Sequence, residues 1–249
     1  WARQHGNKLK TGHLLGNRFR ILVTDLAVPA DEALQRGQAI AAAIAQRGVP
    51  NFFGAQRFGY DGSNVAKGRD ALLGQGPRHD PWLTKLLISA YQAHLFNRYL
   101  ERRIAAGWFG QLLAGDVCKK AETGGMFEVQ DPTAEQPRYA AGEITFTGPL
   151  FGKKMWDALG PAAELESSVL AEAELSRDDL RQARADGTRR PGRLWLPTID
   201  LAVVEPGLAV TFALPKGAYA TVVLREFCKS DQGFELLNSA DSEASQHAG

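Results

Sequence analysis

The stretch NFFGAQRFGYDGSN, residues 51–64, places four aromatic side chains and three glycines within fourteen positions. The rings are Phe52, Phe53, Phe58 and Tyr60. They follow neither the two-residue period of a strand nor the 3.6-residue period of a helix, whereas a core segment would keep its rings at one of these spacings. We therefore expect a shaped loop here, in which glycines let the backbone bend between anchoring rings.

Regular elements are predicted on the amino-terminal side of this loop. The stretch RFRILVTDL, residues 18–26, alternates polar and apolar side chains, which is typical of a half-buried strand. A helix should follow, because Asp31 and Glu32 suit the positive end of a helix dipole and good helix formers come after them. Gly48 and Pro50 are expected to end this helix.

Beyond the loop, PWLTKLLISAYQAHLFNRYLERRIAAG, residues 81–107, has leucines and alanines near helical spacing and predicts a long amphipathic helix. Residues 108–163 are rich in glycine and proline, which predicts turns and brief strands such as EITFT, residues 143–147. Another helix is expected over about 164–185.

Three strands are predicted near the carboxyl end, over residues 193–204, 208–214 and 218–227, with a tight hairpin turn at 215–217. Strands at both ends of the chain with helices between them indicate an α+β fold. The different character of the middle region suggests an insertion domain.

Composition excludes several classes of protein. The 249 residues are 44% hydrophobic, with no apolar run near the roughly 18 residues of a membrane span and no secretory leader. We therefore expect a cytoplasmic protein. Cys118 and Cys228 lie far apart in no zinc-like spacing, so we predict two reduced thiols.

Other common sites find little support. The five histidines show no metal-ligand spacing, and no serine lies in a GxSxG elbow, so we expect neither a metal centre nor a triad hydrolase. The stretch GPLFGKKM, residues 148–155, lacks the spacing and the hydroxyl residue of a nucleotide-binding P-loop. A basic turn is the better interpretation.

Positive charge gathers in two places although the net charge is only +1. Before Asp25 there is no acidic residue, and the basic residues are Arg3, Lys8, Lys10, Arg18 and Arg20. A second cluster comprises Arg181, Arg184, Arg189, Arg190 and Arg193. Such clusters neutralise phosphates well, which suits a nucleic-acid partner. Taken alone, they are explained equally well as solvated faces.

Five motifs in sequence give the chain a family resemblance over nearly its whole length. They are GNRF (16–19), VPNFFGAQRFG (49–59), ISAYQAHLFN (88–97), TGPLFGKKM (147–155) and LPKGAYATVVLREF (214–227). In their order and spacing they resemble the TruD family of tRNA pseudouridine synthases. The resemblance implies a mostly antiparallel catalytic sheet domain, formed by residues 1–49 and 192–249, interrupted by an α/β insertion domain at 50–191.

Family members isomerise a specific uridine of tRNA to pseudouridine without metal or cofactor, so the implied partner is tRNA, with no membrane and no metal. The base must leave the stack and be held while it is detached. By its motif, Phe19 resembles the aromatic platform beneath the uracil, and Asn17 the asparagine that contacts substrate or orients the catalytic carboxylate. Tyr219 matches a pocket-wall position usually held by phenylalanine.

Simpler roles remain open for these substrate-binding candidates. Phe19 could be a core residue of its strand, Asn17 a turn former and Tyr219 an aromatic at the end of a hairpin. The basic residues Lys8, Lys10, Arg18 and Arg20 are the candidates for RNA binding. The sequence makes no prediction of oligomeric state.

The largest departure from the family concerns the nucleophile. The family's essential aspartate lies in a GxKDxxA motif, which this chain does not contain, and it precedes the GNxF motif by more residues than stand before Asn17. We therefore expect the aspartate upstream of Trp1, no catalytic residue in this chain, and no activity from the chain alone. The alternatives are a catalytically inactive RNA-binding module and a structural domain whose basic patches only solubilise it.

Overall fold

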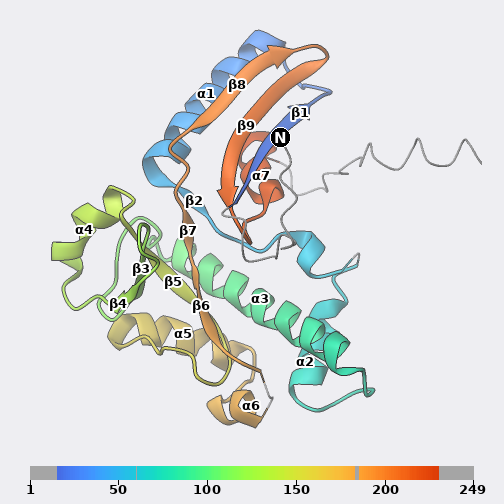
Figure 1. The fold of residues 1–249 in the computed structure, drawn as a ribbon, viewed down its shortest axis with the longest axis vertical. Helices are drawn as coiled ribbons and strands as arrows, with labels where there is room; N and C mark the ends of the chain where they lie inside the picture. The colour runs from blue at the N-terminus through green and yellow to red at the C-terminus, as the bar shows by residue number, and fades with distance from the viewer. Residues whose placement is uncertain (1–15, 60, 183–184, 230–249) are drawn as a thin grey trace, which may run out of the picture.

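The structure, a computed structural model, describes residues 16–59, 61–182 and 185–229. Figure 1 shows two groups of elements joined by a narrow connection. Each group combines helices with an antiparallel sheet, so the fold is α+β, as predicted. No helix within these residues is both long enough and apolar enough to cross a bilayer.

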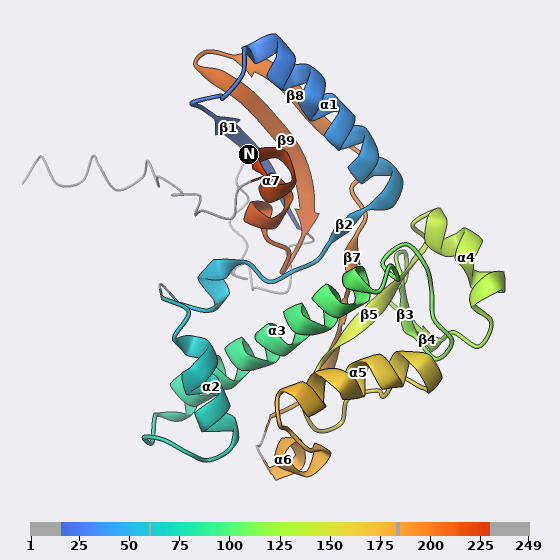
Figure 2. The same ribbon diagram turned by 180° about the vertical axis from the view of Figure 1, so that it is seen from behind.

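The upper group contains β1 (Gly16–Val23), α1 (Ala30–Arg47), β8 (Ile199–Val204), β9 (Gly207–Pro215) and α7 (Ala220–Cys228). Its three strands form an antiparallel sheet in the order β1-β9-β8. Figure 2 shows α1 and α7 against one face of this sheet. The alternation of β1 turns Phe19, Ile21 and Val23 toward these helices, whereas Arg18, Arg20 and Leu22 are exposed on the other face.

The upper core is the cluster of buried side chains on the covered face of that sheet. Its members are Ile44, Val49, Leu194, Leu196, Val210, Phe212, Leu214, Val223 and Leu224. They come from both ends of the chain, so the two terminal parts fold together as one unit.

The lower group surrounds the long helix α3. Its elements are α2 (Asn64–Leu72), α3 (Pro81–Ala105), β3 (Val117–Lys120), β4 (Met126–Glu128), α4 (Pro132–Ala140), β5 (Ile144–Leu150), α5 (Gly160–Glu172), α6 (Arg177–Gln182) and β6 (Thr188–Pro191). The strands form a sheet in the order β4-β3-β5-β6. The lower core is the set of buried side chains between Leu72 and Ala185, with Leu95, Phe96 and Tyr99 of α3 near its centre.

The predicted starts and ends of both long helices are confirmed. Helix α1 has Asp31 and Glu32 in its first turn and ends at Gly48. Helix α3 begins at Asp80, whose side chain accepts hydrogen bonds from two backbone N–H groups at 2.9 Å. The predicted strand at 18–26 is also confirmed as β1.

The two groups are connected by the short antiparallel pair of β2 (Val49–Pro50) and β7 (Arg193–Leu194). The chain passes into the lower group after β2 and returns through β7. These strands lie at the predicted domain boundaries, 49/50 and 191/192, and the division into catalytic and insertion domains stays a prediction.

The predicted strand at 218–227 is wrong, because these residues form α7. Ala220, Val223, Leu224 and Phe227 recur at helical spacing and pack on the upper core, although the run of β-branched residues suggested a strand. The hairpin predicted through 215–217 is therefore absent from the described residues, and β9 pairs with β8 instead.

The structure differs from the prediction at three further places. The helix predicted over 164–185 is two helices, α5 and α6, with Glu174 in a left-handed conformation between them. The strand predicted over 193–204 is divided into β7 and β8. Residues 108–163 hold an unpredicted helix, α4, which begins where the Asp131 side chain caps two N–H groups.

Candidate functional site

The loop that follows β2 lies between the two cores and is held at its first residue. The Asn51 N–H donates to the Gly192 carbonyl oxygen at 3.0 Å, and Asn51 Nδ2 donates to the Pro191 carbonyl oxygen at 2.8 Å. Asn51 is only 4% exposed. The loop therefore starts from a fixed point at the connection between the two groups.

The Asn97 side chain of α3 forms hydrogen bonds with both the backbone N–H and the backbone carbonyl oxygen of Phe53. Its N–H donates to Asn97 Oδ1 at 2.9 Å, and Asn97 Nδ2 donates to its carbonyl oxygen at 3.0 Å. The Phe53 ring lies 5.6 Å from Phe96 and 5.9 Å from Tyr219, centroid to centroid, in edge-on geometry. One ring of the loop thus contacts both the long helix of the lower group and the residue that precedes α7.

Tyr219 is the residue immediately before α7, not the end of a hairpin. A Cβ placed at Gly54 would lie 3.1 Å from the Tyr219 ring and 3.0 Å from Thr221 Oγ1. The loop backbone therefore lies against the first turn of α7, and a larger residue at position 54 would require these side chains to shift.

Arg190, near the end of β6, joins the loop to the turn after β9. Its Nε donates to the Asn51 carbonyl oxygen at 3.2 Å, and its Nη2 donates to Asn51 Oδ1 at 2.7 Å. Its Nη1 donates to the Gly217 carbonyl oxygen at 3.0 Å. The guanidinium carbon lies 3.9 Å from the centre of the Phe53 ring, a cation–π contact.

Asn17 and Phe19 lie on the covered face of the upper sheet. Phe19 pairs with Phe212 of β9, and their ring centroids are 5.8 Å apart. Asn17 is exposed and pairs with Leu214, at the end of β9 from which the chain turns toward Tyr219. Phe19 is half-buried and packs on the upper core.

Arg18 and Arg20 extend from the opposite face of β1 because successive strand residues alternate. Both are exposed, and Arg18 lies 4.0 Å from Asp200 of β8. The structure therefore does not bring these two arginines together with Asn17 and Phe19. The other RNA-binding candidates, Lys8 and Lys10, lie outside the described residues.

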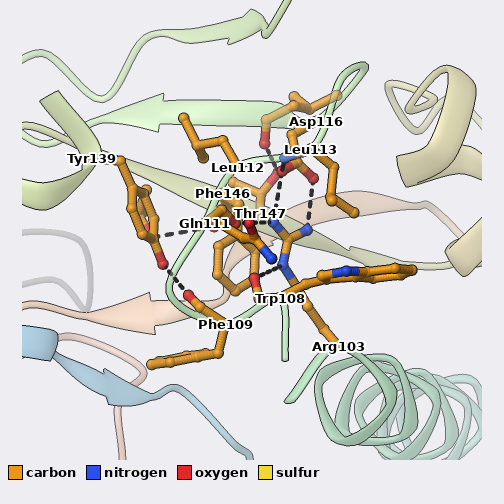
Figure 3. Close-up of polar contacts among 12 residues, drawn as sticks. Arg103, Trp108, Phe109, Gln111, Leu112, Leu113, Asp116, Tyr139, Phe146 and Thr147 are labelled. Atoms are coloured by element: carbon orange, nitrogen blue, oxygen red, sulfur yellow. Dashed lines mark hydrogen bonds and ion pairs between the residues drawn. The ribbon is translucent and has the colours of Figure 1, made fainter. Parts of the chain in front are cut away.

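A second polar cluster lies at the end of α3, and Figure 3 shows the contacts among its residues. Arg103 donates to both carboxylate oxygens of Asp116 at 2.7 Å and to the Tyr99 hydroxyl at 3.0 Å. Its guanidinium also stacks on Phe146, 3.8 Å from the ring centre. Since Arg103 and Asp116 are 0% and 1% exposed, this cluster has no access to a substrate and serves to anchor α3 in the lower group.

Comparisons with known proteins identify the kind of protein to which this geometry belongs. The family model described as tRNA pseudouridine synthase D (TruD) matches residues 1–69 and 78–227. The chain belongs to the TruD family. A relative named tRNA pseudouridine synthase D from Anaeromyxobacter sp. (strain Fw109-5) is 45% identical over 243 residues, which cover 94% of this chain and 66% of the relative.

Two further TruD relatives also match most of this chain. The relative of the same name from Thermus thermophilus is 43% identical over 228 residues, which cover 92% of this chain and 62% of the relative. A crystal structure from Methanosarcina mazei that carries the TruD name superposes with a TM-score of 0.74 at 25% identity, over 88% of this chain and 70% of that one. The chain spans about two thirds of the length of these curated TruD relatives.

We call the connection at β2 and β7, together with the loop that follows β2, the junction. The sequence does not predict the roles of two residues there. It presents Arg190 only as one member of an arginine cluster and Asn97 only as the last residue of a TruD motif. Neither carries a local pattern that signals its contacts, because its partners lie far away in the sequence: Asn51 for Arg190 and Phe53 for Asn97.

Proposed function

We propose that this chain is the larger part of a tRNA pseudouridine synthase, an isomerase of the TruD type. The reaction breaks the glycosidic bond between N1 of a uracil and the ribose, turns the base, and joins its C5 to the same sugar carbon. The observation that supports this most directly is that two TruD motifs far apart in the chain meet in space, because the rings of Phe53 and Tyr219 lie 5.9 Å apart. Asn17 of a third motif pairs with Leu214, close to the end of β9 from which the chain continues to Tyr219.

In this proposal the chain supplies the walls that hold the uracil. Phe19 stacks beneath the flipped base, an interaction worth about 1 to 3 kcal/mol. Asn17 contacts the substrate or orients the attacking carboxylate, and the ring of Tyr219 closes the pocket from the side of α7. The reaction needs no metal or cofactor, and the protein acts in the cytoplasm on tRNA.

The chain has no match to the GxKDxxA motif that carries the nucleophile in the family. We therefore expect residues 1–249 alone to bind tRNA without isomerising it. The same absence favours a second candidate function, an RNA-binding module without activity. The two differ in whether the full gene product forms pseudouridine.

The test is to map pseudouridines in unmodified tRNA after incubation with the full gene product and with residues 1–249. We expect one new pseudouridine site with the former and none with the latter. Phe19→Leu keeps apolar packing against Phe212 but loses the stack, so it should lower kcat/KM of the full product about tenfold or more. Leu22→Ala, on the exposed face of the same strand, is the control and should have little effect.

If the full gene product binds tRNA but leaves every uridine unchanged, the inactive binding module is the correct function. If it neither binds nor modifies tRNA, both candidate functions are wrong.

A further inference from the structure

Arg190 is a half-buried cation without a negative partner among the described residues. Its three hydrogen bonds go to the carbonyl-type oxygens of Asn51 and Gly217, which are neutral. No carboxylate lies within ion-pair distance of it in the part of the chain that the structure describes. Burial lowers the pKa of Arg190 to about 10, and the nearby charge of Arg57 acts in the same direction. A charge held in this way is costly unless an anion approaches it.

Arg57 lies within the loop that follows β2 and also lacks a negative partner among the described residues. Its Nη2 donates to the Ser89 hydroxyl at 2.6 Å, and its Nε is buried with no hydrogen-bond partner among the described residues. It too has no ion pair with a described carboxylate. The Arg57 N–H donates to the Gly54 carbonyl oxygen at 2.9 Å, and Gly54 lies against the first turn of α7. Arg57 and Arg190 thus both contact the loop that follows β2, and a ligand that carries negative charge would stabilise both cations.

The first turn of α7 adds a third source of positive potential beside the same loop. The helix has nine residues, no acidic residue in its first turn and no side-chain cap at Tyr219. The Thr221 hydroxyl oxygen in that turn is buried, and the structure gives it no hydrogen-bond partner within the described residues. Uncapped N–H groups and a spare hydroxyl at a helix N-terminus are suited to phosphate oxygens.

We propose that Arg190 and Arg57, with the first turn of α7, form a binding subsite for one RNA backbone phosphate beside the uridine pocket. The inference rests on the proposed function, since it assigns the phosphate to the tRNA substrate. Arg190 has five N–H donors and uses three on protein oxygens, so two remain for the ligand. Because the same side chain holds Gly217 and stacks on Phe53, phosphate binding is coupled to the position of Tyr219.

The experiment measures binding of residues 1–249 to an unmodified tRNA transcript by fluorescence anisotropy over a series of salt concentrations. Each phosphate contact contributes about 0.7 to 0.9 to the slope of log affinity against log salt. Arg190→Gln and, separately, Arg57→Gln should each weaken binding by about tenfold and reduce this slope by about that amount. Arg190→Lys keeps the charge and should keep most of the slope.

The control is Arg138→Gln, an arginine of α4 paired with Glu135 at 2.7 Å, which should change neither affinity nor slope. Thermal melting identifies any variant that fails to fold, and Arg57→Gln decides the outcome if Arg190→Gln does not fold, since Arg57 has fewer protein contacts.

A lower affinity with an unchanged slope would mean that these arginines only support the loop, and it would overturn the phosphate subsite while leaving RNA binding intact. A wild-type chain without salt-dependent tRNA binding would contradict both the subsite and the proposed function. Loss of slope in both glutamine variants, with the control unchanged, supports the subsite.

Discussion

Arg103 and Arg190 are both withdrawn from water, but the described residues give them different partners. Arg103 is completely enclosed, with a carboxylate on two of its donors and backbone carbonyls of Trp108 and Gln111 on others. Arg190 is half-buried and meets only neutral oxygens among the described residues. The protein itself satisfies Arg103, whereas Arg190 uses three of its five N–H donors, and we propose that the other two bind a phosphate.

The enclosed pair gives a stability prediction. Asp116→Asn leaves the charge of Arg103 buried without compensation, so it should lower the free energy of unfolding by about 3 to 5 kcal/mol. The control is Asp157→Asn, which breaks an exposed pair with Arg177 and should cost less than about 1 kcal/mol. Urea denaturation followed by circular dichroism measures both. Equal losses in the two variants would mean that the Arg103 cluster is not the anchor described.

At the scale of elements, α7 shows why a segment with conflicting patterns cannot be assigned to a helix or a strand from its sequence. Strand β1 and helices α1 and α3 have a single period and clear end signals, so they were predicted correctly. In α7 the β-branched composition favours a strand while the spacing of Ala220, Val223, Leu224 and Phe227 favours a helix, and packing on the upper core decides for the helix.

A sequence motif can select candidate site residues only where the motif lies on one element. Asn17 and Phe19 belong to a single strand, and their motif was sufficient to select them as candidates. The contacts of Arg190 and Asn97 join segments that are far apart in the chain, and no local periodicity reports such contacts. Arg18 and Arg20 were selected by charge, which does not say that they lie on the other face of the sheet.

The proposed uracil pocket depends on the pairing of β1 with β9. A Cβ at Gly16 would lie 2.2 Å from the Leu214 carbonyl oxygen, so Gly16→Ala must push the two strands apart next to Asn17. We expect a loss of about 1 to 3 kcal/mol in stability and weaker tRNA binding. Gly110→Ala, where no heavy atom lies within 4 Å, is the control. If both variants melt alike, the close approach at Gly16 is not required.

At the scale of the whole molecule, the upper and lower cores are connected by β2 and β7 and by the loop that follows β2. The chain crosses between them at β2 and β7, and the loop after β2 adds Asn51 and Phe53 as connections to β6 and α3. Next to this connection, Arg190 donates to the Gly217 carbonyl oxygen and the rings of Phe53 and Tyr219 lie 5.9 Å apart. We therefore propose that tRNA lies along the junction and contacts both groups at once.

The position of tRNA on the molecule is the central claim, and photo-cross-linking tests it most directly. A tRNA transcript containing 4-thiouridine is irradiated in complex with residues 1–249, and the cross-linked peptides are identified by mass spectrometry. We predict cross-links within residues 51–59 and 215–221, which border the junction. Cross-links confined to β8, on the exposed face of the upper sheet beside Arg18, would contradict the claim.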